Sequence, residues 1–395
     1  MQLTNKQEQG LKIALDRYKH GERYTVISGY AGTGKSTLVR FIIDALTGAG
    51  INEEEDVCYA CYTGKACQVL INMGNRNVST LHKLLYESIP KSTGGWIRKP
   101  KTEIPYRIII VDEVSMAPKQ MMDMLFKHDV HVICLGDPFQ LPPIDKDADN
   151  HLLDNPHIFL DEIMRQAADS EIIQLATKIR HFEPFTADMF AGNEVKILKH
   201  SDLNMGVLEW GDQVLVATNA TRVKFNNSMR ESLGHGSRPE DGDKLICLRN
   251  YWEDLSDQAN PLVNGTIGYL QNSYESFLNL PYWAKPRTLP IITGDFIGET
   301  GEYFGGFNMD KKLILEGEKT LDWKTSYRLN ANVKTCHLVP FEFTYGYAIT
   351  CWKAQGSQWD RVVVYEEGFP FDKTTHAKFL YTAITRAKEK VVLLR

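Results

Sequence analysis

The stretch GYAGTGKST at residues 29–37 constrains the fold of this chain more than any other. Gly29, followed after four residues by Gly34, Lys35 and Ser36, has the spacing of a phosphate-binding P-loop. Its glycines permit backbone angles that a Cβ would forbid, so the main chain can curl around a phosphate. Backbone N–H groups and the start of the following helix then face the anion. Lys35 would reach the β- and γ-phosphates, and the Ser36 hydroxyl would bind Mg²⁺.

The flanks of this loop have the pattern that a P-loop requires. Residues 24–28 are β-branched or aromatic and predict a buried strand, and residues 37–46 predict a helix with an apolar stripe. A chance glycine-rich turn is therefore disfavoured. Because kinases, GTPases, transporters and motors all use this loop, the motif alone does not identify the function.

Composition excludes several classes of protein. The chain has 395 residues, which predicts two or three domains, and its 43% apolar and 24% charged content is that of a soluble protein. No apolar run could span a bilayer, and the first residues lack the pattern of a signal peptide. We therefore expect an intracellular, cytoplasmic protein without a membrane partner. The net charge of −5 argues against a uniformly basic nucleic-acid coat protein, but it permits a locally basic groove.

The seven cysteines do not form a disulfide framework over this length. Cys58 and Cys61 have metal-ligand spacing, and Cys67 lies nearby. They sit in a strand-like stretch, however, and no second ligand pair follows. Reduced structural cysteines are favoured over a zinc site.

The order of expected elements predicts two α/β units. Strands near 24–28, 57–62, 107–111 and 130–135 alternate with helices near 5–19, 35–48, 64–73 and 118–128, which predicts a parallel sheet covered by helices. Residues 88–101 break this pattern with turn formers, basic residues and Trp96, and predict a protruding hairpin or loop. Alternation resumes near 155–235 and again from about 336, with strands near 338–345, 361–365 and 390–394. The segment between them is rich in Gly, Pro, Asn and aromatic residues with short β-like runs, and predicts an inserted β domain.

Three further segments carry residues suited to nucleotide chemistry. Asp112 and Glu113 follow the apolar run at 108–111, as in a Walker-B strand; Asp112 would reach the metal and Glu113 would orient or deprotonate water. Such a pair is also common in surface turns, but the P-loop upstream favours the functional interpretation. Gln140 follows another expected strand and could sense the γ-phosphate, although its loop is also a proline-rich turn. Arg386 and Arg165 are either ordinary capping or salt-bridging arginines, or groups that stabilise phosphate charge in the transition state.

Taken together, these segments resemble the superfamily 1 DNA helicases of the 5′-to-3′ branch, the Dda-like and RecD-like enzymes. The similar segments run in order along nearly the whole chain: LTNKQ at 3–7, GYAGTGKST at 29–37, VDEVSM at 111–116, GDPFQLPP at 136–143, MRQ at 164–166, VNGTIG at 263–268, AITCWKAQGS at 348–357 and YTAITRA at 381–387. The resemblance implies an α/β fold with two RecA-like P-loop motor domains, a pin-like insertion in the first and a small SH3-like β-barrel in the second. The expected ranges are 1–152 for the first motor domain with the pin at 86–103, 153–235 and 336–395 for the second, and 236–335 for the β domain.

The resemblance also implies which residues bind the nucleotide, ATP, together with Mg²⁺. Gln7 would read the adenine, and Ser36 and Asp112 would hold the metal. The implied nucleotide contacts are Gln7, Gly29, Ala31, Gly32, Thr33, Gly34, Lys35, Ser36, Thr37 and Gly356. The implied catalytic residues are Lys35, Asp112, Glu113, Gln140, Arg165 and Arg386.

A second implied set would contact DNA. Small hydroxyls and amides suit a protein that must release each phosphate as it moves, and the implied contacts are Thr63, Thr80, His82, Asn219, Trp352 and Lys353. Trp96 would either stack on the junction base pair as part of the pin or pack against the β insertion, with equal weight. The family usually has His where this chain has Trp352, and an indole can stack on a base but cannot copy the hydrogen bonds of an imidazole.

The expected function is that of an ATP-dependent 5′-to-3′ helicase acting on single-stranded DNA and duplex junctions, in replication, recombination or repair. Its implied protein partners are a single-strand-binding protein or replication proteins, and a monomer suffices for this mechanism. The alternatives are a DNA-stimulated ATPase that remodels protein–DNA complexes without unwinding, and a small-molecule kinase, which would not need the later motifs. A nuclease is disfavoured because no separate carboxylate cluster accompanies the Walker pair. The preference for DNA over RNA comes from the resemblance alone.

Overall fold

A computed structural model describes residues 3–90, 96–143, 149–251, 262–299, 301–332, 334–368 and 372–395. The chain divides into two compact units. Unit 1 comprises Met1–Leu85, Lys101–Ala217 and Thr350–Arg395, and unit 2 comprises Tyr86–Pro100 and Thr218–Ile349. Each unit is described by itself below.

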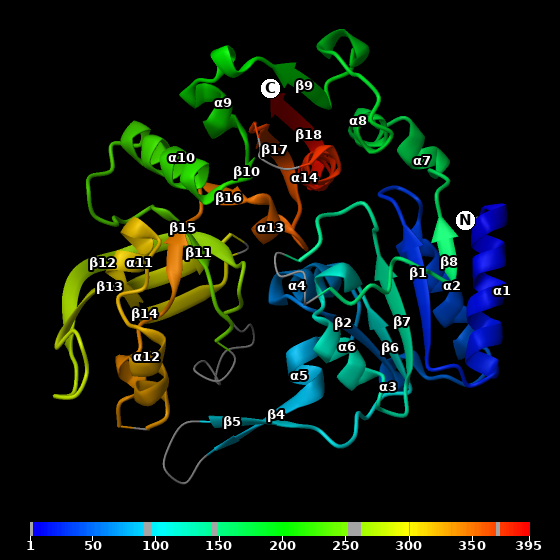
Figure 1. The fold of residues 1–395 in the computed structure, drawn as a ribbon, viewed down its shortest axis with the longest axis horizontal. Coiled ribbons are helices and arrows are strands. Elements are labelled where there is room, and N and C mark those ends of the chain that lie inside the picture. Colours follow the sequence, from blue (N-terminus) through cyan, green and yellow to red (C-terminus); the bar gives the residue numbers. More distant parts are fainter. Residues whose placement is uncertain are drawn as a thin grey trace. The chain divides into compact units, whose positions relative to one another are not determined.

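The first sheet of unit 1 has six parallel strands in the order β3-β2-β6-β7-β1-β8 (Figure 1). Its strands are β1 (Tyr24–Gly29), β2 (Val57–Cys61), β3 (Val78–Thr80), β6 (Ile108–Val111), β7 (His131–Gly136) and β8 (Ile158–Leu160). Strands β2, β6 and β7 are buried at every position, as expected for a parallel sheet covered on both faces. The carboxyl ends of β1, β6 and β7 therefore meet at one edge, where the P-loop and the carboxylates begin.

Helical segments in the same part of the chain accompany this sheet. They are α1 (Asn5–Lys19), α2 (Lys35–Thr47), α3 (Glu53–Asp56), α4 (Gly64–Asn72), α5 (Leu81–Leu85) and α6 (Lys119–Leu125), with the 3₁₀ turn η1 (Val114–Met116). Of these, α1 and α2 pack on the sheet through apolar stripes. Helix α2 buries Leu38, Ile42 and Leu46, which recur every four residues, in the core formed with β1 and β7. Thr4 caps the start of helix α1. Its hydroxyl accepts a hydrogen bond from Gln7 N, and Thr4 N donates to the Gln7 side-chain oxygen, which together form a capping box.

The second sheet has the order β16-β10-β17-β18-β9, and the strand pairs β10–β17, β17–β18 and β18–β9 are parallel. Its strands are β9 (Val195–Leu198), β10 (Gln213–Val216), β16 (Ala348–Thr350), β17 (Trp359–Tyr365) and β18 (Ala387–Leu394). The accompanying helical segments are α7 (Arg165–Ala168), α8 (Glu171–Arg180), η3 (Ala187–Met189), η4 (His200–Asp202), α9 (Met205–Trp210), α13 (Cys351–Ala354) and α14 (Lys373–Ile384). The expected α/β fold with parallel sheets is thus confirmed.

Unit 2 contains an antiparallel sheet of order β14-β13-β12-β11-β15. Its elements are α10 (Asn219–Ser232), β11 (Lys244–Cys247), β12 (Ile267–Asn279), β13 (Thr288–Gly298), β14 (Tyr303–Asp310), α11 (Lys311–Glu316), α12 (Trp323–Asn330), η5 (Cys336–Leu338) and β15 (Phe343–Tyr345). The closure of this sheet into an SH3-like barrel stays a prediction. The strand expected at 338–345 begins only at Phe343, because Pro340 has no N–H to donate and restricts the residue before it.

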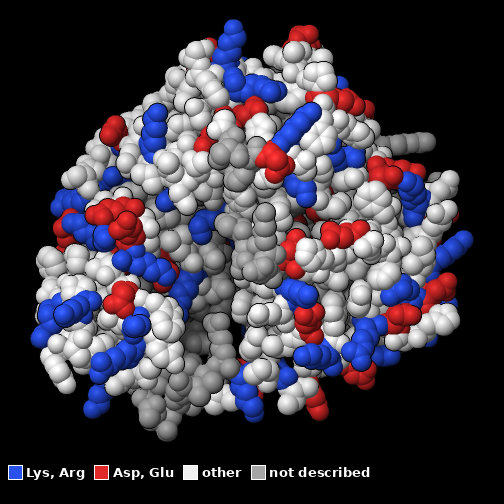
Figure 2. Space-filling model, in the orientation of Figure 1, with Lys and Arg blue, Asp and Glu red and all other residues white. Residues whose placement is uncertain are grey.

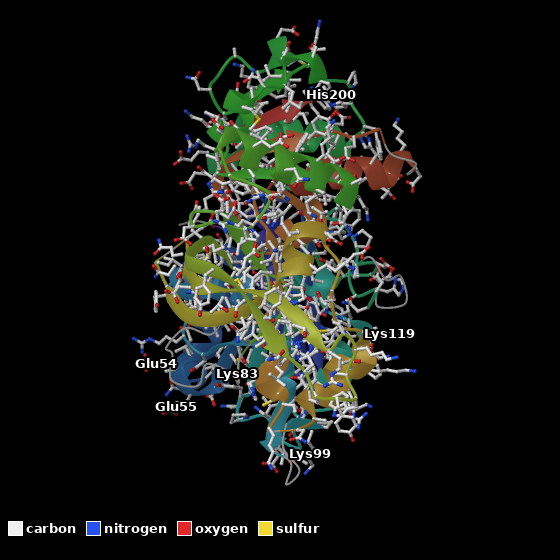
Figure 3. All side chains as sticks on the ribbon, turned by 90° about the vertical axis from the view of Figure 1, so that its left-hand side faces the viewer. Glu54, Glu55, Lys83, Lys99, Lys119 and His200 are labelled. Carbon is white, nitrogen blue, oxygen red and sulfur yellow. The ribbon has the colours of Figure 1, made fainter. Side chains whose placement is uncertain are left out.

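The segment that interrupts the first sheet forms a two-stranded antiparallel ribbon, β4 (Tyr86–Pro90) and β5 (Trp96–Pro100). Ile89 lies opposite Ile97, and Pro90 lies opposite Trp96. Lys99, labelled in Figure 3, faces Glu87 across the ribbon at 3.9 Å. Within the described ranges, no helix combines the length and the apolarity needed to cross a membrane.

Candidate active site

The P-loop connects β1 to α2 in a conformation that only glycine adopts freely. Gly32 and Gly34 have φ angles of 76° and 77°, in the left-handed region. A Cβ at Gly34 would overlap the side chains of Met164 and Gln7, and one at Gly29 would lie 2.8 Å from the Leu160 carbonyl oxygen. The expected strand–loop–helix arrangement is therefore present, and close packing adds to the need for glycine.

Cationic groups and helix polarity make this loop a site for an anion. Lys35 Nζ donates to the carbonyl oxygens of Gly29 at 2.7 Å and Tyr30 at 3.1 Å, so the ammonium lies against the loop. Ser36 and Thr37 lie in the first turn of α2, which carries no acidic residue. The positive end of the helix dipole and its free N–H groups thus face the loop without a competing carboxylate.

A cavity of about 630 Å³ opens in front of the P-loop. Residues from both sheets of unit 1 line it, among them Gly32, Gly34, Lys35, Ser36, Thr37, Asp112, Glu113, Asp137, Gln140, Gly356 and Arg386. Most of the residues that the sequence assigned to nucleotide chemistry therefore surround one space. Its size is typical of a small-molecule site.

The two carboxylates after β6 lie in different environments. Burial, and secondarily the charge of Glu113, raises the pKa of Asp112 to about 6, against the opposing charges of Lys35 and Arg386. Glu113 has a φ of 51°, a left-handed conformation that is unfavourable for a residue with a side chain. Such strain is typical of functional positions, where the surrounding structure enforces it.

Glu113 contacts Gln140 and an arginine from the second sheet. Arg386 Nη1 lies 3.8 Å from Glu113 Oε1. With its amide oriented to satisfy both neighbours, Gln140 donates to Glu113 Oε2 at 3.1 Å and accepts from Arg386 Nη2 at 3.3 Å. Arg386 is 4% exposed, and its Nε and Nη1 also donate to the carbonyls of Thr382 and Ser357. Glu113, the candidate base, and Gln140, the candidate γ-phosphate sensor, are thus both in contact with the buried guanidinium of Arg386.

Sequence reasoning missed two residues that connect the sheets. Tyr381, on α14, donates its hydroxyl to Asp137 Oδ2 at 2.6 Å and accepts from the P-loop amide of Ala31 at 2.8 Å. Asp137 is 2% exposed, and burial raises the pKa of its carboxyl. Asp137 follows a strand as Asp112 does, so the same strand-end argument could have found it. Tyr381 lies in the segment YTAITRA, but no local pattern assigned it a role, because its partners lie about 240 and 350 residues away.

Gly356 lines the cavity from outside the P-loop, and Gln7 contacts the P-loop itself. Gln7 is 1% exposed, and its amide donates to the carbonyl oxygens of Thr33 at 3.3 Å and Gly34 at 3.4 Å. Gly356 has a φ of 75°, and a Cβ there would lie 3.1 Å from Thr63 Oγ1. The side chain of Arg165 lies outside the described parts of the chain, so its role stays a prediction.

Ser36 and Asp112 both line the cavity and carry side-chain oxygen atoms. Mg²⁺ prefers hard oxygen ligands and usually takes one or two from protein, with phosphates and water completing its shell. These two residues therefore fit that metal. No group of three or more His, Cys, Asp or Glu in the described ranges is arranged to hold a metal without a further ligand. None of the seven cysteines, all of which lie in the described ranges, forms a disulfide bond, and burial raises the pKa of Cys58 to about 12.

The residues expected to contact DNA lie in three places. Thr80 is the last residue of β3 and pairs with Cys61, the last residue of β2. Thr63 lies two residues after the end of β2. Thr63 accepts from Ala66 N as the cap of α4, while Thr80 is fully buried and accepts from Lys83 N. The His82 ring lies 5.7 Å from that of Tyr62.

Trp352 and Lys353 lie in α13, and Asn219 begins α10 in unit 2. Trp352 Nε1 donates to the Pro142 carbonyl at 3.1 Å, so the indole contacts the loop after β7. Asn219 Oδ1 accepts from Arg222 Nε at 3.2 Å. The side chain of Trp96 is outside the described residues. The contact of all these residues with DNA stays a prediction.

Two protein families match this chain. Residues 2–194 match the AAA domain, and residues 345–394 match the UvrD-like helicase C-terminal domain. Among solved structures, one of two coordinating Pif1 helicases that unwind forked double-stranded DNA has a TM-score of 0.55 at 17% identity. It covers 100% of this chain and 92% of its own. The Pif1 helicase from Bacteroides with ADP-AlF3 and single-stranded DNA has a TM-score of 0.53 at 18% identity, with the same coverage. These likenesses support the fold.

Three curated relatives are similar in sequence. The uncharacterized protein R530 of Acanthamoeba polyphaga mimivirus is 31% identical, over 92% of this chain and 93% of its own length. The ATP-dependent RecD2 DNA helicase of Deinococcus radiodurans is 27% identical, over 94% of this chain and 46% of its own. The ATP-dependent DNA helicase dda of Enterobacteria phage T4 is 28% identical, over 58% of this chain and 57% of its own length. This chain spans about half the length of the latter two. The ordered motifs, the two matched domains and these relatives together place the chain among the Dda- and RecD-like superfamily 1 helicases.

Proposed function

We propose that this protein is an ATP-dependent DNA helicase that moves 5′-to-3′ on a single strand and separates duplex DNA. The observation that carries the proposal is the contact of Arg386, from the second sheet, with Glu113 and Gln140, from the first. A guanidinium that stabilises the transition state must be in place when hydrolysis occurs. Hydrolysis would therefore depend on how the two sheets are arranged, as a motor requires.

Each residue of the cavity has a proposed task in hydrolysis. Lys35 binds the β- and γ-phosphates, and Ser36 with Asp112 holds Mg²⁺, which neutralises phosphate charge when bound. Glu113 orients and deprotonates the attacking water. Gln140 senses the γ-phosphate. Gln7 would lie beside the adenine, and Arg165 would supply a second positive charge.

The track for single-stranded DNA is proposed to include Thr63, Thr80, His82 and Lys353 of unit 1. Asn219 and Trp96 are the proposed contacts of unit 2, with Trp96 on a strand-separating pin. Relatives named as ATP-dependent DNA helicases, and neighbours solved with single-stranded or forked DNA, support this assignment. One chain carries both sheets, so we propose that a monomer suffices, with a single-strand-binding protein or replication proteins as partners.

We also propose that the functional domains follow the ranges expected from the motifs. The first motor domain would comprise residues 1–152 with the pin at 86–103. The second would comprise 153–235 and 336–395, with the β domain at 236–335. Limited proteolysis tests this proposal, because domain boundaries concentrate cleavage sites. Cleavage confined to the interior of these ranges would contradict it.

The decisive experiment compares two partial duplexes, one with a 5′ single-stranded tail and one with a 3′ tail, with and without ATP. We expect ATP-dependent strand separation of the 5′-tailed duplex alone. The matched control is Glu113→Gln, which should bind ATP yet hydrolyse it about 10²–10⁴-fold more slowly, because a general base contributes that much. Unwinding by this variant at a rate greater than its residual ATP hydrolysis allows would come from a contaminating enzyme.

The other outcomes overturn different parts of the proposal. Unwinding of the 3′-tailed duplex alone would retain the motor and overturn the direction. ATP hydrolysis stimulated by single strands without unwinding would favour a translocase that remodels protein–DNA complexes. Hydrolysis indifferent to DNA would overturn the motor assignment altogether.

A further inference from the structure

Unit 2 exposes three large aromatic side chains in a small region. Trp323 and Tyr327 on α12 are 74% and 57% exposed, and Tyr282, in the connection from β12 to β13, is 83% exposed. We call these three residues the aromatic surface. A cluster of large aromatic side chains exposed to water, unlike a single one, indicates a candidate binding site.

The aromatic surface is not required to build the core beneath it. Helix α12 is anchored by Leu329, which is fully buried and packs with Leu280, Leu289 and Ile291 of the β12–β13 hairpin. Trp323 and Tyr327 are four residues apart and therefore share one side of the helix. Their rings stack, with centroids 5.4 Å apart and planes at 21°. Two flat faces are thus presented together to solvent.

The neighbouring charges are almost all positive. The segments 280–289 and 321–335 contain five cations, Lys285, Arg287, Lys324, Arg328 and Lys334, and one acid, Asp322. The Asp322 carboxylate caps α12, where it accepts from Thr325 N at 2.8 Å and Thr325 Oγ1 at 2.9 Å. These segments carry a net charge of +4 in a chain whose net charge is −5. Figure 2 shows mainly Lys and Arg in the lower left, where Figure 1 places α12.

These cations are available to a ligand. In the described parts of the chain, none of the five makes an ion pair with a carboxylate. Two of them order the surface: the Arg328 guanidinium lies 4.0 Å from the centroid of Trp283, and Arg287 Nη1 donates to the Tyr282 carbonyl at 3.3 Å. These contacts fix the β12–β13 connection to α12. Binding a ligand would therefore cost little conformational entropy in these side chains.

Flat rings among unpaired cations match one class of ligand well. Bases of a single-stranded nucleic acid stack on aromatic faces, while Lys and Arg bind its phosphates. In a duplex the base faces are already stacked on each other and cannot reach the rings. We propose that the aromatic surface and its five cations bind single-stranded nucleic acid, as a second site separate from the track proposed above.

Photocrosslinking of the full chain tests this location directly. The probe is an oligonucleotide of 5-iodouracil, followed by mass spectrometry of the crosslinked peptides. We expect crosslinks at Trp323, Tyr327 or Tyr282. Crosslinked peptides that all lie outside residues 280–289 and 321–335 would overturn the proposal, while crosslinks in these two segments alone would support it and count against the track proposed above.

Affinity measurements give a second, independent readout. The variant Trp323→Ala/Tyr327→Ala should bind a long oligo-dT about tenfold more weakly than the natural protein, because two stacked bases are lost. Its ATP hydrolysis with a short oligo-dT, which reports on the motor, should be unchanged. The matched control is Tyr274→Ala, because Tyr274 on β12 is also 61% exposed and lies next to Glu275, which is paired with Lys311.

The two readouts separate failure of this site from failure of the helicase proposal. Unchanged affinity of the double variant for the long oligo-dT, with a circular dichroism spectrum like that of the natural protein, would overturn the site and leave the motor intact. An equal loss in Tyr274→Ala would also overturn it, because exposed aromatic residues in general would then explain the effect. Loss of affinity in a protein without ATPase activity would retain the site and overturn the motor.

Discussion

At the scale of single residues, the cavity combines groups that cost stability with groups that supply function. Asp112 is the clearest example, because its ionised form is disfavoured by burial and by the adjacent Glu113. Its carboxyl lies beside Lys35 and Arg386, whose charges only partly compensate. A charge kept at such a buried site lowers the free energy of unfolding, as is common where a residue is needed for function.

The variant Asp112→Asn should therefore be more stable and inactive. The folded pKa of about 6 lies above the usual value of 3.8, so ionisation destabilises the folded state increasingly from about pH 4 to about pH 6, fully above that, and has little effect below about pH 4. The gain at pH 8 should be about 1–3 kcal/mol, since each unit of pKa corresponds to about 1.4 kcal/mol. Urea unfolding at pH 8 and at pH 4 measures it, and the gain should vanish at pH 4. A variant less stable than the natural protein at pH 8 would contradict this account.

Tyr381 gives a second prediction at this scale. In Tyr381→Phe, the Asp137 carboxylate and the Ala31 amide each lose a partner, which should lower the free energy of unfolding by about 1–3 kcal/mol. The hydroxyl lowers the pKa of Asp137, so its loss raises that pKa further. The destabilisation should thus be larger at pH 8 than at an acidic pH below the pKa of Asp137, where protonation of its carboxyl relieves the loss. Denaturation at both pH values tests this, with Tyr274→Phe, an exposed tyrosine, as control.

The sequence predicted the residues that local backbone patterns place, and not those placed by packing. Asp112 follows a buried strand and Lys35 follows a glycine loop, and both patterns are visible within ten residues. The pairing of Tyr381 with Asp137 and Ala31 depends on how the two sheets pack, which no local spacing encodes. The three-residue strands β3 and β8 were missed for a similar reason, since a short edge strand is defined by its partner.

At the scale of elements, unit 2 depends on a buried carboxylate. Asp243, immediately before β11, is fully buried and accepts from Arg230 Nε at 2.8 Å and Nη2 at 3.0 Å. It also accepts from Tyr347 Oη at 3.0 Å and Glu240 N at 2.8 Å, and His235 Nδ1 lies 2.8 Å away. One side chain thus connects α10, the following loop, β11 and the segment after β15.

Removal of this carboxylate should unfold unit 2 preferentially. Asp243→Ala leaves the guanidinium of Arg230, which is 5% exposed, without its counter-charge, and such a loss costs about 3–5 kcal/mol. Hydrogen exchange should show lost protection in β11–β13 and unchanged protection in β6 and β7. The control is Glu318→Ala, which removes an exposed ion pair with Lys312 and should change stability little. Equal effects of the two variants would mean that the network around Asp243 contributes nothing special.

At the scale of the whole molecule, the proposed motor needs the chemistry in the cavity to be transmitted to DNA. Two contacts connect the loop after β7 to the second sheet's segments: Leu141 N donates to Thr382 Oγ1 at 2.9 Å, and Gln355 Nε2 donates to the Leu141 carbonyl at 2.7 Å. The Trp352 indole adds a third through the Pro142 carbonyl. The loop that carries Gln140 is therefore tied to the segment that carries Trp352 and Lys353, which is the segment expected to contact DNA.

Trp352→Phe separates this connection from stacking on a base, because phenylalanine keeps an aromatic ring and loses the N–H. We expect the affinity for single-stranded DNA and the ATPase rate to stay within about twofold, since a single neutral hydrogen bond contributes only about 0.5–1.5 kcal/mol. The number of base pairs opened per ATP hydrolysed should fall, because the loop and the DNA segment are then less firmly joined. Unwinding and phosphate release measured in one reaction give this ratio, with Trp210→Phe, distant in sequence on α9, as control. An unchanged ratio together with weaker DNA binding would show instead that Trp352 acts by stacking on the strand.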